Sequence, residues 1–410
     1  MAKVAILGFG TVGSGVWEIL SQNAGVCARR AGVPVEVGYI CDIRDFSAHQ
    51  AAGLFVNNIE PILQDKDVKV VVETIGGLHP AYEYVRAALE SGRCVVTSNK
   101  ELVAEKGTEL MRIAKAHGVC FLFEASVGGG TPVIGPMHRD LAANHILSVE
   151  GIVNGTTNFM LTRMRQAGLS FEQALAEAQA LGYAETRDPS ADVDGIDAKR
   201  KIAILASLAF GRHVPPEAVP ARGIRAVTPQ DVALAAQLGC AVKLVAWARE
   251  GAPGRIEAAV EPMLVRNEDL LSDVDDVFNA VRVRCDMLGD TVFYGRGAGK
   301  LPTASAVVAD VAEALREGAA VHDTLWWTPP LAGGETLAGT RRADTLLRFS
   351  GAGAAQLAAA LGGAAQLLWQ GEGQCAFLAR AAAPGDVRAA QARAQKAGAF
   401  CENTLRMLAE

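Results

Sequence analysis

Several features that would indicate export, a membrane role or nucleic-acid binding are missing from this 410-residue chain. Its eight cysteines are scattered, without a Cys-x-x-Cys pair, so we expect neither a disulfide framework nor a zinc site. No apolar run approaches the roughly 20 residues of a membrane span, and no signal peptide precedes the strand-like start at Lys3. A net charge of −6 without a basic run argues against nucleic acid as a partner. These absences predict a cytoplasmic protein with free thiols.

A glycine-rich loop follows the first apolar strand and opens a helix, with the residues Gly8, Phe9, Gly10, Thr11, Val12 and Gly13. In the dinucleotide-binding fingerprint the first glycine permits a tight turn, the second admits the pyrophosphate and the third allows close helix packing. The N-terminus of the helix then offers N–H donors to the phosphates. This pattern predicts an NAD or NADP site rather than a plain glycine-rich turn.

The residues after the second strand are compatible with either dinucleotide. Asp42 is placed to accept hydrogen bonds from both ribose hydroxyls, which favours NAD. Arg44 is placed to pair with a 2′-phosphate, which favours NADP. The sequence alone therefore leaves both cofactors open.

The chain is too long for one hydrophobic core, so two or three domains are expected. Apolar runs alternate with helical patterns in its first third and predict a doubly wound parallel sheet, with strands at 3–7, 35–40, 68–73, 93–97 and 119–124. We expect an α/β protein with four parts: a Rossmann-type domain at 1–135 plus about 300–325, a central α+β domain at 136–299, a linker at 326–343, and a small βαββαβ domain at 344–410.

The most distinctive stretch is residues 182–201, in which five carboxylates precede a lysine that opens an apolar helix: Glu185, Asp188, Asp192, Asp194 and Asp197 come before Lys201. Asp197 and Lys201 are four residues apart and share one face of a helix. A lysine at the mouth of a buried helix must be paired or lose its proton, which suits a general acid/base. The alternative is an acidic helix N-terminus that favours the macrodipole, with an ion pair beside it.

At this point the chain resembles the homoserine dehydrogenase family, and the similarity covers nearly all of it. The long family signature is matched by Ala178, Gly182, Tyr183, Asp188-Pro189, Asp192-Val193, Gly195, Asp197 and Lys201. Four other stretches are similar to the family: Thr97 to Lys100, Glu124 to Gly130, Gly151 to Asn158, and Gly297 to Gly299 with Pro302 to Ser305.

The resemblance implies reversible NAD(P)-linked oxidation of L-homoserine to L-aspartate 4-semialdehyde, on the route to threonine, isoleucine and methionine. It also implies that the central domain contributes to a homodimer or homotetramer. His49 and Gln50 stand where family members often carry a further lysine or arginine, which argues against a strong NADP preference.

Roles for individual residues follow from the same resemblance. Lys201 is expected to be the acid/base group, with Lys100 at the reaction centre. Substrate contacts are expected from Glu185, Asp197, Asp192, Tyr183 and Thr156. Further cofactor contacts are expected from Arg44, Thr74, Ser98, Asn99, Lys100, Gly182 and Gly299. A monovalent cation, usually sodium, is expected near the turn formed by Glu124, Val127, Gly129 and Thr131, held largely by carbonyl oxygens.

Elementary chemistry agrees with these roles. The ammonium group of homoserine needs carboxylates, and two neighbouring lysines lower each other's pKa toward neutrality. A solvent-facing helix start is the alternative for Lys100, but its place at the carboxyl end of a sheet strand favours a site. For Glu124 the alternative is a carboxylate that pairs with a nearby base.

The C-terminal βαββαβ region is similar in order and length to an ACT domain, which in many family members binds an amino-acid effector. However, the usual Asp-x-Pro-Gly turn is replaced by Ser350 to Ala354, so an effector module and an assembly module are both open. Two alternative functions are another amino-acid dehydrogenase and a non-catalytic sensor. The signature from Asp188 to Lys201 argues against the first, and the intact set of Lys100, Lys201, Glu185 and Asp197 argues against the second.

Overall fold

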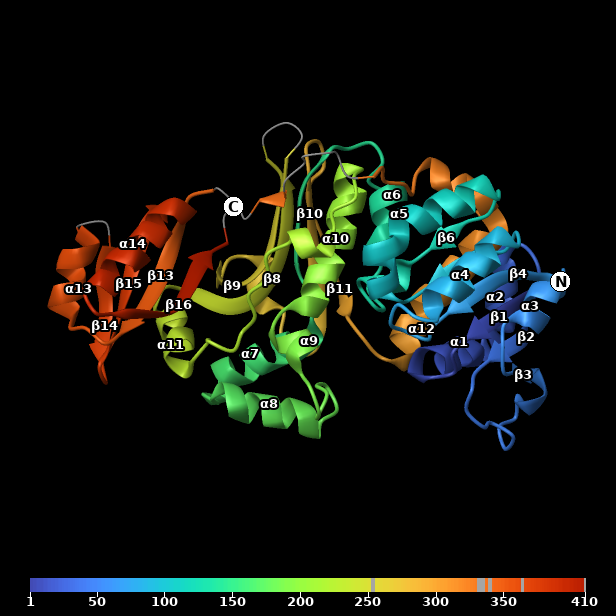
Figure 1. Cartoon of the computed structure of the whole chain (residues 1–410), viewed down its shortest axis with the longest axis horizontal. Coiled ribbons are helices and arrows are strands. Elements are labelled where there is room, and N and C mark those ends of the chain that lie inside the picture. The colour runs from blue at the N-terminus through green and yellow to red at the C-terminus, as the bar shows by residue number, and fades with distance from the viewer. Residues whose placement is uncertain (252–254, 330–335, 338–340, 363–364, 409–410) are drawn as a thin grey trace. The chain divides into compact units, whose positions relative to one another are not determined.

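The computed structural model describes residues 1–251, 255–329, 336–337, 341–362 and 365–408. The chain divides into two compact units (Figure 1), the first formed by 1–149, 200–218 and 279–334 and the second by 150–199, 219–278 and 335–410. Part of the expected linker, at 330–335 and 338–340, lies outside the described residues. Among the residues that are described, no helix is both long and apolar enough to cross a bilayer.

The first unit contains a six-stranded sheet in the order β3-β2-β1-β4-β5-β6, with every neighbouring pair parallel. Its strands are β1 (Ala2–Leu7), β2 (Val35–Cys41), β3 (Phe55–Val56), β4 (Val68–Glu73), β5 (Cys94–Thr97) and β6 (Phe121–Leu122). Val70, Val71 and Val72 are all fully buried, as expected for a strand covered on both faces. The order reverses between β1 and β4, and the crevice at such a reversal is where doubly wound sheets bind ligands.

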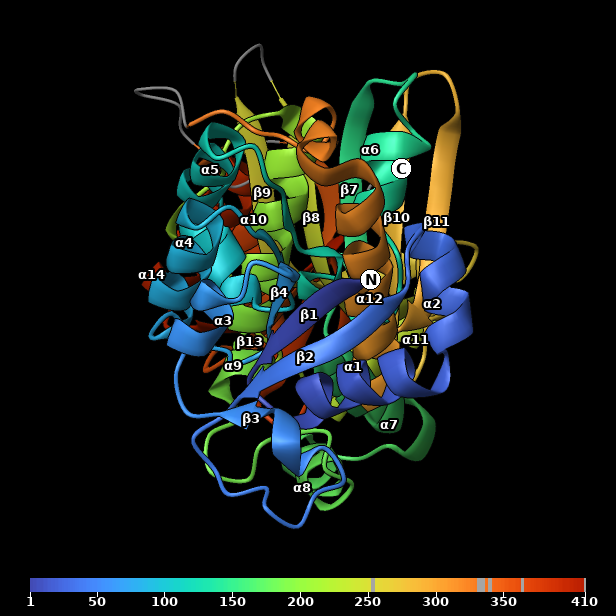
Figure 2. The same ribbon diagram turned by 90° about the vertical axis from the view of Figure 1, so that its right-hand side faces the viewer.

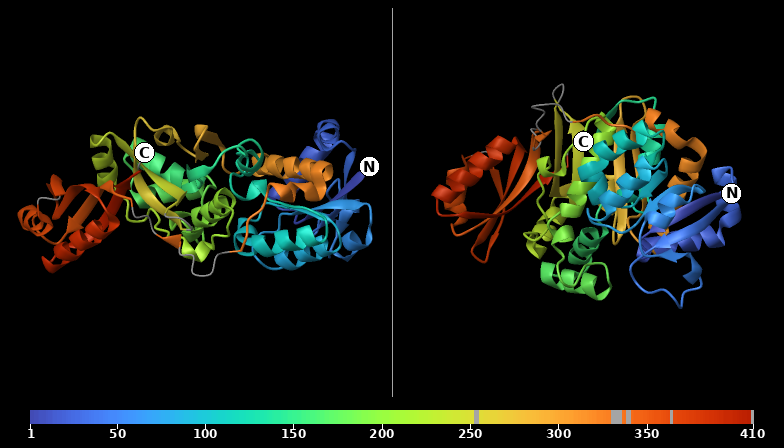
Figure 3. Two further views of the ribbon diagram at one scale, coloured as in Figure 1. Left: turned by 90° about the horizontal axis from the view of Figure 1, so that it is seen from above. Right: turned by 45° about the vertical axis from the view of Figure 1, so that its right-hand side comes forward.

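Helices cover both faces of this sheet (Figures 2 and 3). One face carries α1 (Thr11–Gln22), α2 (Ala24–Ala31) and α12 (Lys300–Glu317), and the other carries α4 (Ala81–Glu90) and α5 (Lys100–Ala116). The helix α12 comes from far along the chain and packs against α1 and α2. Shorter pieces of this unit are α3 (Glu60–Gln64), α6 (Ile134–Arg139) and the adjacent strands β10 (Phe278–Cys285) and β11 (Gly289–Arg296).

Besides β10, whose first residue Phe278 belongs to the second unit, two elements run from one unit into the other along the chain, namely β7 (Ile146–Ile152) and α10 (Ile196–Phe210). The prediction that Lys201 opens its helix is wrong, because α10 already begins at Ile196. Gly195, with a φ of 78°, follows the short helix α9 (Ser190–Val193) and lets the chain turn into α10. Asp197 then lies in the first turn, where a carboxylate is favoured.

The second unit combines α7 (Gly155–Ala167), α8 (Phe171–Ala180) and α11 (Pro229–Gln237) with a mixed sheet. Its strands run in the order β8-β9-β16-β13-β15-β14, with β9 and β16 parallel and β8 and β9 antiparallel. Their bounds are β8 (Cys240–Glu250), β9 (Ile256–Arg266), β13 (Ala343–Ser350), β14 (Ala365–Gly371), β15 (Gln374–Ala382) and β16 (Phe400–Met407), and β12 (Thr336–Leu337) pairs with β9. The predicted α/β fold class is confirmed.

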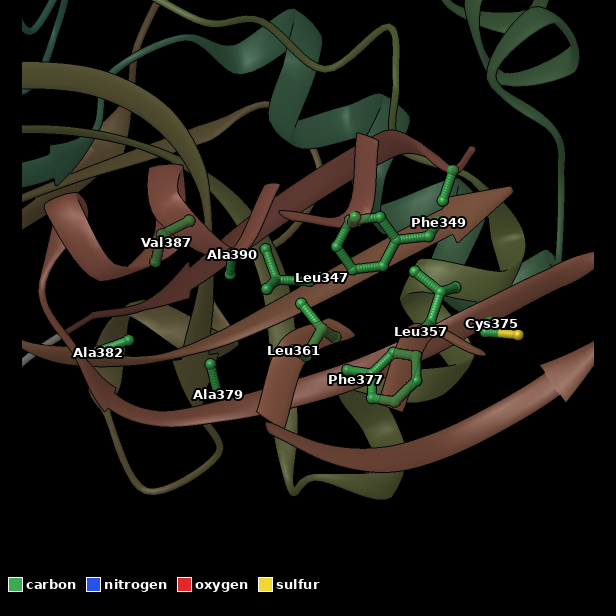
Figure 4. Packing of buried hydrophobic residues seen from close by; sticks show 12 residues of the cluster. Leu347, Phe349, Leu357, Leu361, Cys375, Phe377, Ala379, Ala382, Val387 and Ala390 are labelled. Atoms are coloured by element: carbon green, nitrogen blue, oxygen red, sulfur yellow. The ribbon is translucent and has the colours of Figure 1, made fainter. Parts of the chain in front are cut away.

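The last part of the second unit has the predicted βαββαβ order, with α13 (Ala354–Leu361) and α14 (Pro384–Lys396) between its strands. One face of its sheet packs on both helices through a cluster that includes Phe349, Leu357 and Phe377 (Figure 4). Side chains alternate along a strand, so Arg348 points to the opposite face, where it pairs with the buried Asp231 of α11 at 2.9 Å. The module is thus joined to the rest of its unit by a buried ion pair.

Candidate active site

The glycine loop after β1 has the geometry that its sequence predicts. Gly8 has a φ of 88°, which favours glycine. A Cβ on Gly13 would lie 2.0 Å from the carbonyl oxygen of Gly8, so α1 packs too closely for any side chain there. A Cβ on Gly10 would meet nothing within 4 Å, which leaves its backbone open to a ligand. The loop therefore offers an open approach to the N-terminus of α1, as pyrophosphate binding requires.

Asp42 and Arg44 bind each other at the end of β2. The Asp42 carboxylate accepts hydrogen bonds from Nε and Nη2 of Arg44, at 3.0 and 2.7 Å, and from the backbone N–H groups of Phe9 and Arg44. The hydrogen bonds from Arg44 lower the pKa of Asp42 to about 2. The Arg44 side chain is 57% exposed and lies over the ring of Phe46. The Asp42 carboxylate is therefore fully hydrogen-bonded, whereas the Arg44 guanidinium is accessible to solvent.

Three of the expected cofactor contacts follow the carboxyl ends of β4 and β5. Thr74 donates its hydroxyl hydrogen bond toward the carbonyl oxygens of Gly8, at 2.8 Å, and Leu7, at 3.0 Å, which ties it to the glycine loop. Ser98 and Asn99 follow β5, and Asn99 caps α5 by accepting the N–H of Leu102 at 3.1 Å. These residues lie at the same edge of the sheet, because parallel strands end together.

The two expected catalytic lysines lie on helices that contact each other. Lys100 is the first residue of α5, and Lys201 lies on α10 with only 8% of its surface exposed. Glu101 and Arg200, the chain neighbours of these lysines, form an ion pair of 2.7 Å. The start of α5 is therefore held against α10 in the region of both lysines.

Two of the expected substrate carboxylates are held by one side chain that the sequence did not single out. Asn154 donates from its amide nitrogen to Asp192 at 2.7 Å and to Asp197 at 3.0 Å. Its amide oxygen accepts the N–H of Thr157, which caps α7. Asn154 and Asp197 are each 5% exposed. In the sequence, Asn154 stands at the start of a helix, a common capping position, within the family-like stretch from Gly151 to Asn158.

The other expected substrate contacts lie on α7 and on the loop after α8. Thr156 donates to the carbonyl oxygen of Tyr183 at 2.6 Å, and the Tyr183 ring packs edge-on against Phe159. Glu185 is exposed on this loop, and Gly182 has a φ of 74° at its start. Thr156 and Tyr183 are therefore brought together, whereas Glu185 lies on an open segment.

The turn expected to hold a cation is packed against the segment that leads into α12. Gly130 donates its N–H to the carbonyl oxygen of Arg296 at 3.1 Å, and Gly299 is the N-cap of α12. The backbone N–H of Thr131 donates to the carbonyl oxygen of Gly128 at 2.9 Å. The cation turn and the Gly299 cofactor segment thus lie side by side in the first unit.

Within the described part of the chain, the Glu124 carboxylate binds backbone N–H groups rather than a base. Its carboxylate accepts backbone N–H groups from Val133, Ile134 and Gly135, at 2.7, 3.0 and 2.6 Å, so it caps α6. Its own N–H donates to Asp310, whose pKa is raised by burial and by the neighbouring Glu124 charge. No ion pair of Glu124 with a base is seen among the described residues.

An unsatisfied amide lies beside the same segment. Asn279 on β10 is 1% exposed, and within the described structure neither polar atom of its side chain has a hydrogen-bond partner. A Cβ on Gly297 would lie about 2 Å from that amide, so Asn279 packs directly against this glycine. A buried amide without a partner is unfavourable, so this position calls for an explanation.

Comparisons with known proteins agree with this geometry. One family model, described as the NAD binding domain of homoserine dehydrogenase, matches residues 8–124, and a second, described as homoserine dehydrogenase, matches residues 132–312. The homoserine dehydrogenase of Neisseria gonorrhoeae is 44% identical over 316 residues, which are 77% of this chain and 72% of that protein. That of Synechocystis is 45% identical over 313 residues, 75% of this chain and 72% of that protein.

Solved structures show the same relationship. A homoserine dehydrogenase from Thiobacillus denitrificans has a TM-score of 0.90 at 36% identity, covering 99% of this chain and 98% of that chain. A hyperthermophilic archaeal homoserine dehydrogenase in complex with NADPH has a TM-score of 0.65 at 31% identity, covering 76% of this chain and 97% of that chain.

The parallel sheet, its glycine loop and the matched NAD-binding model define an NAD(P)-binding oxidoreductase. Identity above 40% to two homoserine dehydrogenases, over three quarters of the chain, identifies the family. The chain belongs to the homoserine dehydrogenase family, as its resemblance predicts.

Proposed function

We propose that this chain interconverts L-homoserine and L-aspartate 4-semialdehyde, with Lys201 as the acid/base group and Lys100 beside it. The observation that carries the proposal is the pattern on α10, where Asp197 and Lys201 lie four residues apart and both are almost completely buried. Asn154 holds Asp197 in place through a hydrogen bond. The Glu101–Arg200 ion pair holds α5, which begins at Lys100, against α10.

The reaction needs a base for the hydroxyl proton and a carboxylate for the substrate ammonium. In oxidation, Lys201 takes the proton from the C4 hydroxyl while a hydride leaves C4, and in reduction Lys201 returns that proton. The dinucleotide, when bound, supplies the hydride acceptor. Asp197 and Asp192 hold the ammonium group, with Glu185, Thr156 and Tyr183 completing the substrate contacts on the second unit. Lys100 keeps a second positive charge near the reacting oxygen, which favours the neutral, basic form of Lys201.

We further propose NADP as the preferred dinucleotide. Asp42 is already engaged by four donors, so little of its capacity remains for a ribose diol. The exposed Arg44 guanidinium can instead form a charge-assisted pair with a 2′-phosphate. The remaining contacts are assigned to residues 8–13, Thr74, residues 98–100, Gly182 and Gly299.

A sodium ion at the turn of Glu124, Val127, Gly129 and Thr131 is a further proposal. The orphaned amide of Asn279 beside Gly297 supports a ligand in this region, and the hydroxyl and carbonyl oxygens of the turn suit a hard monovalent cation. Initial rates measured in sodium, potassium and tetramethylammonium chloride at equal ionic strength test it. Equal rates in all three would remove the cation from the account.

For the assembly we propose a homodimer or homotetramer. Apolar side chains stand exposed on β7, on β11 and in the turn before β11, including Leu147, Met287, Leu288 and Tyr294. Such a group on a folded surface is typical of an interface. Sedimentation equilibrium distinguishes these assemblies from a monomer, which would contradict the proposal. A cytoplasmic location stays a prediction from cysteine usage.

Initial-rate oxidation of L-homoserine, compared with L-serine and L-threonine, tests the proposed function. We expect turnover of L-homoserine with either dinucleotide and at least 100-fold lower kcat/KM for the other two, whose hydroxyl lies one carbon closer to the ammonium group. Comparable turnover of L-serine would indicate another amino-acid dehydrogenase. Folded protein that binds nucleotide without turnover of any of the three would indicate a sensor.

A further inference from the structure

One fully buried carboxylate in the first unit belongs to none of the roles assigned above. Glu73 is the last residue of β4 and is 0% exposed. Its carboxylate accepts hydrogen bonds from the hydroxyl of Thr97 at 2.5 Å and from the backbone N–H groups of Ile75 and Gly76 at 2.7 and 3.1 Å. These donors are all uncharged. Glu73 thus connects the loop after its own strand with the end of the neighbouring strand β5.

A second layer of hydrogen bonds extends this connection to the start of α5. The Thr97 hydroxyl oxygen accepts the N–H of Asn99 at 2.9 Å. Asn99 donates from its amide to the carbonyl oxygen of Gly77 at 2.6 Å and accepts the N–H of Leu102 at 3.1 Å. The loop at 74–77 and the start of α5 are therefore bound to each other twice, once through Glu73 and Thr97 and once through Asn99.

The two segments joined in this way carry several of the expected site residues. Thr74 begins the loop after β4 and contacts the glycine loop through Gly8. Gly76 and Gly77 have φ values of 83° and 69°, so the loop has little rigidity of its own and depends on the hydrogen bonds that fix it. Lys100 is the first residue of α5 and directly follows Asn99. A shift of Glu73 would move both segments together.

A carboxylate is an unfavourable choice for a place this deep. Burial raises the pKa of Glu73, which reflects the penalty on its charged form. A glutamine would fill the same space without that penalty. Its advantage is that a carboxylate offers only acceptors and can satisfy three convergent donors at once, which an amide cannot do without turning an N–H toward one of them.

We propose that Glu73 is a positioning residue of the active site, which sets the place of Lys100 and of the 74–77 loop through Thr97 and Asn99. This inference rests on the proposed function, since it gives Lys100 and Thr74 their roles. Glu73 touches neither substrate nor dinucleotide in this account. A misplacement of a reacting group by about 1 Å can cost about 100-fold in rate, so a residue that positions Lys100 affects kcat.

The substitution Glu73→Gln tests the proposal with nearly the same side-chain volume. We expect kcat for L-homoserine oxidation to fall 10- to 100-fold, the KM for L-homoserine to change less than threefold, and the Kd for NADPH to rise about fivefold. The melting temperature is expected to change little, because the removal of a buried charge offsets the loss of one hydrogen bond to the side chain. Thr97→Val should lower kcat in the same way as Glu73→Gln. Thr97→Ser keeps the hydroxyl and should have the wild-type kcat.

Asp231→Asn is the matched control, because Asp231 is 1% exposed and its side chain binds Arg348 and Asn403 of the C-terminal module and Thr228 at the start of α11. It should lower the melting temperature while kcat of the folded enzyme stays at the wild-type value. For Glu73→Gln, a wild-type kcat, or a fall in kcat that merely parallels a fall in melting temperature, would overturn the proposal. If the wild-type protein does not oxidise L-homoserine, the proposed function fails. In that case the Kd for NADPH still tests the role of Glu73, and an unchanged Kd in Glu73→Gln would overturn this inference.

Discussion

At the scale of single residues, motifs in the sequence named the expected site residues, but they did not name the groups that hold those residues in place. The glycine loop, Lys100, Lys201, Asp192 and Asp197 all come from motifs that are continuous in the sequence. Asn154 lies 38 and 43 positions before its two carboxylate partners, so only the folded chain brings them together. In the sequence, Glu73 is only the last residue of a predicted strand, and its three hydrogen-bond donors become evident only in the structure.

The amide of Asn154 gives a prediction at this scale. Asn154→Asp places a third carboxylate against Asp192 and Asp197, which raises the pKa of the group by like-charge repulsion. We expect the KM for L-homoserine to rise at least tenfold at pH 7, with a smaller change in the Kd for NADPH. Steady-state kinetics together with a fluorescence titration of NADPH measure the two quantities.

The control for this change is Asn144→Asp, on the loop before β7, where the side chain contacts Leu141 and Leu288. Its kinetics should match those of the wild type. If Asn154→Asp also keeps the wild-type KM, the two acids do not bind the substrate ammonium in the way proposed.

Arg44 gives a second prediction. Arg44→Ala removes the proposed partner of the 2′-phosphate and frees Asp42 for a ribose diol. The ratio of kcat/KM for NADP to kcat/KM for NAD is expected to fall at least tenfold, which corresponds to about 1.4 kcal/mol. Arg86→Ala, which removes an exposed ion pair with Glu90 on α4, is the control. An unchanged ratio in Arg44→Ala would show that this arginine does not determine cofactor choice.

At the scale of elements, hydrophobic periodicity predicted whether most segments are helices or strands. It predicted the residues at which those elements end less well. Both helices of the C-terminal module fall where the pattern puts them, at 354–361 and 384–396. The run at 119–124 predicted a full strand, yet β6 is only Phe121–Leu122. Glu124 instead turns to cap α6 through three backbone N–H groups, a tertiary contact that overrides strand propensity.

The glycine loop supplies the prediction at the element scale. Gly10→Ala should leave the melting temperature unchanged, because its Cβ meets nothing within 4 Å, but should weaken NADPH binding at least tenfold by obstructing the pyrophosphate. Gly13→Ala should lower the free energy of unfolding by about 1–3 kcal/mol, because its Cβ would lie 2.0 Å from the Gly8 oxygen. Thermal melts and NADPH titrations of both variants separate the two effects. Tight binding by Gly10→Ala would place the pyrophosphate elsewhere.

At the scale of the whole molecule, the order of elements predicted the Rossmann sheet and the βαββαβ module, because both have regular patterns in a continuous stretch. The way β16 and β13 join β9 in one mixed sheet could not be predicted, since strand neighbours far apart in the sequence carry no local signal. The helix predicted at about 300–325 was assigned to the Rossmann-type domain, and α12 packs against α1 and α2 of that domain.

The ion pair between Arg348 and Asp231 gives a prediction at this scale. Arg348→Met leaves Asp231 buried without its cation and should lower the free energy of unfolding by about 3–5 kcal/mol. Arg342→Ala removes an ion pair with Asp386 in the same module whose two side chains are 67% and 57% exposed, and its effect should be below about 1 kcal/mol. Urea unfolding of both variants provides the comparison. Equal stabilities would mean that the buried pair does not join the module to α11.

The central claim is that Lys201 transfers the proton of the substrate hydroxyl. The most direct test is kcat for L-homoserine oxidation in Lys201→Met, with the Kd for NADPH measured on the same sample and Lys199→Met on the same helix as the control. The account predicts that kcat falls by about 100- to 10,000-fold in Lys201→Met while the Kd for NADPH changes little, and that Lys199→Met matches the wild type. A Lys201→Met enzyme that keeps the wild-type kcat would contradict it.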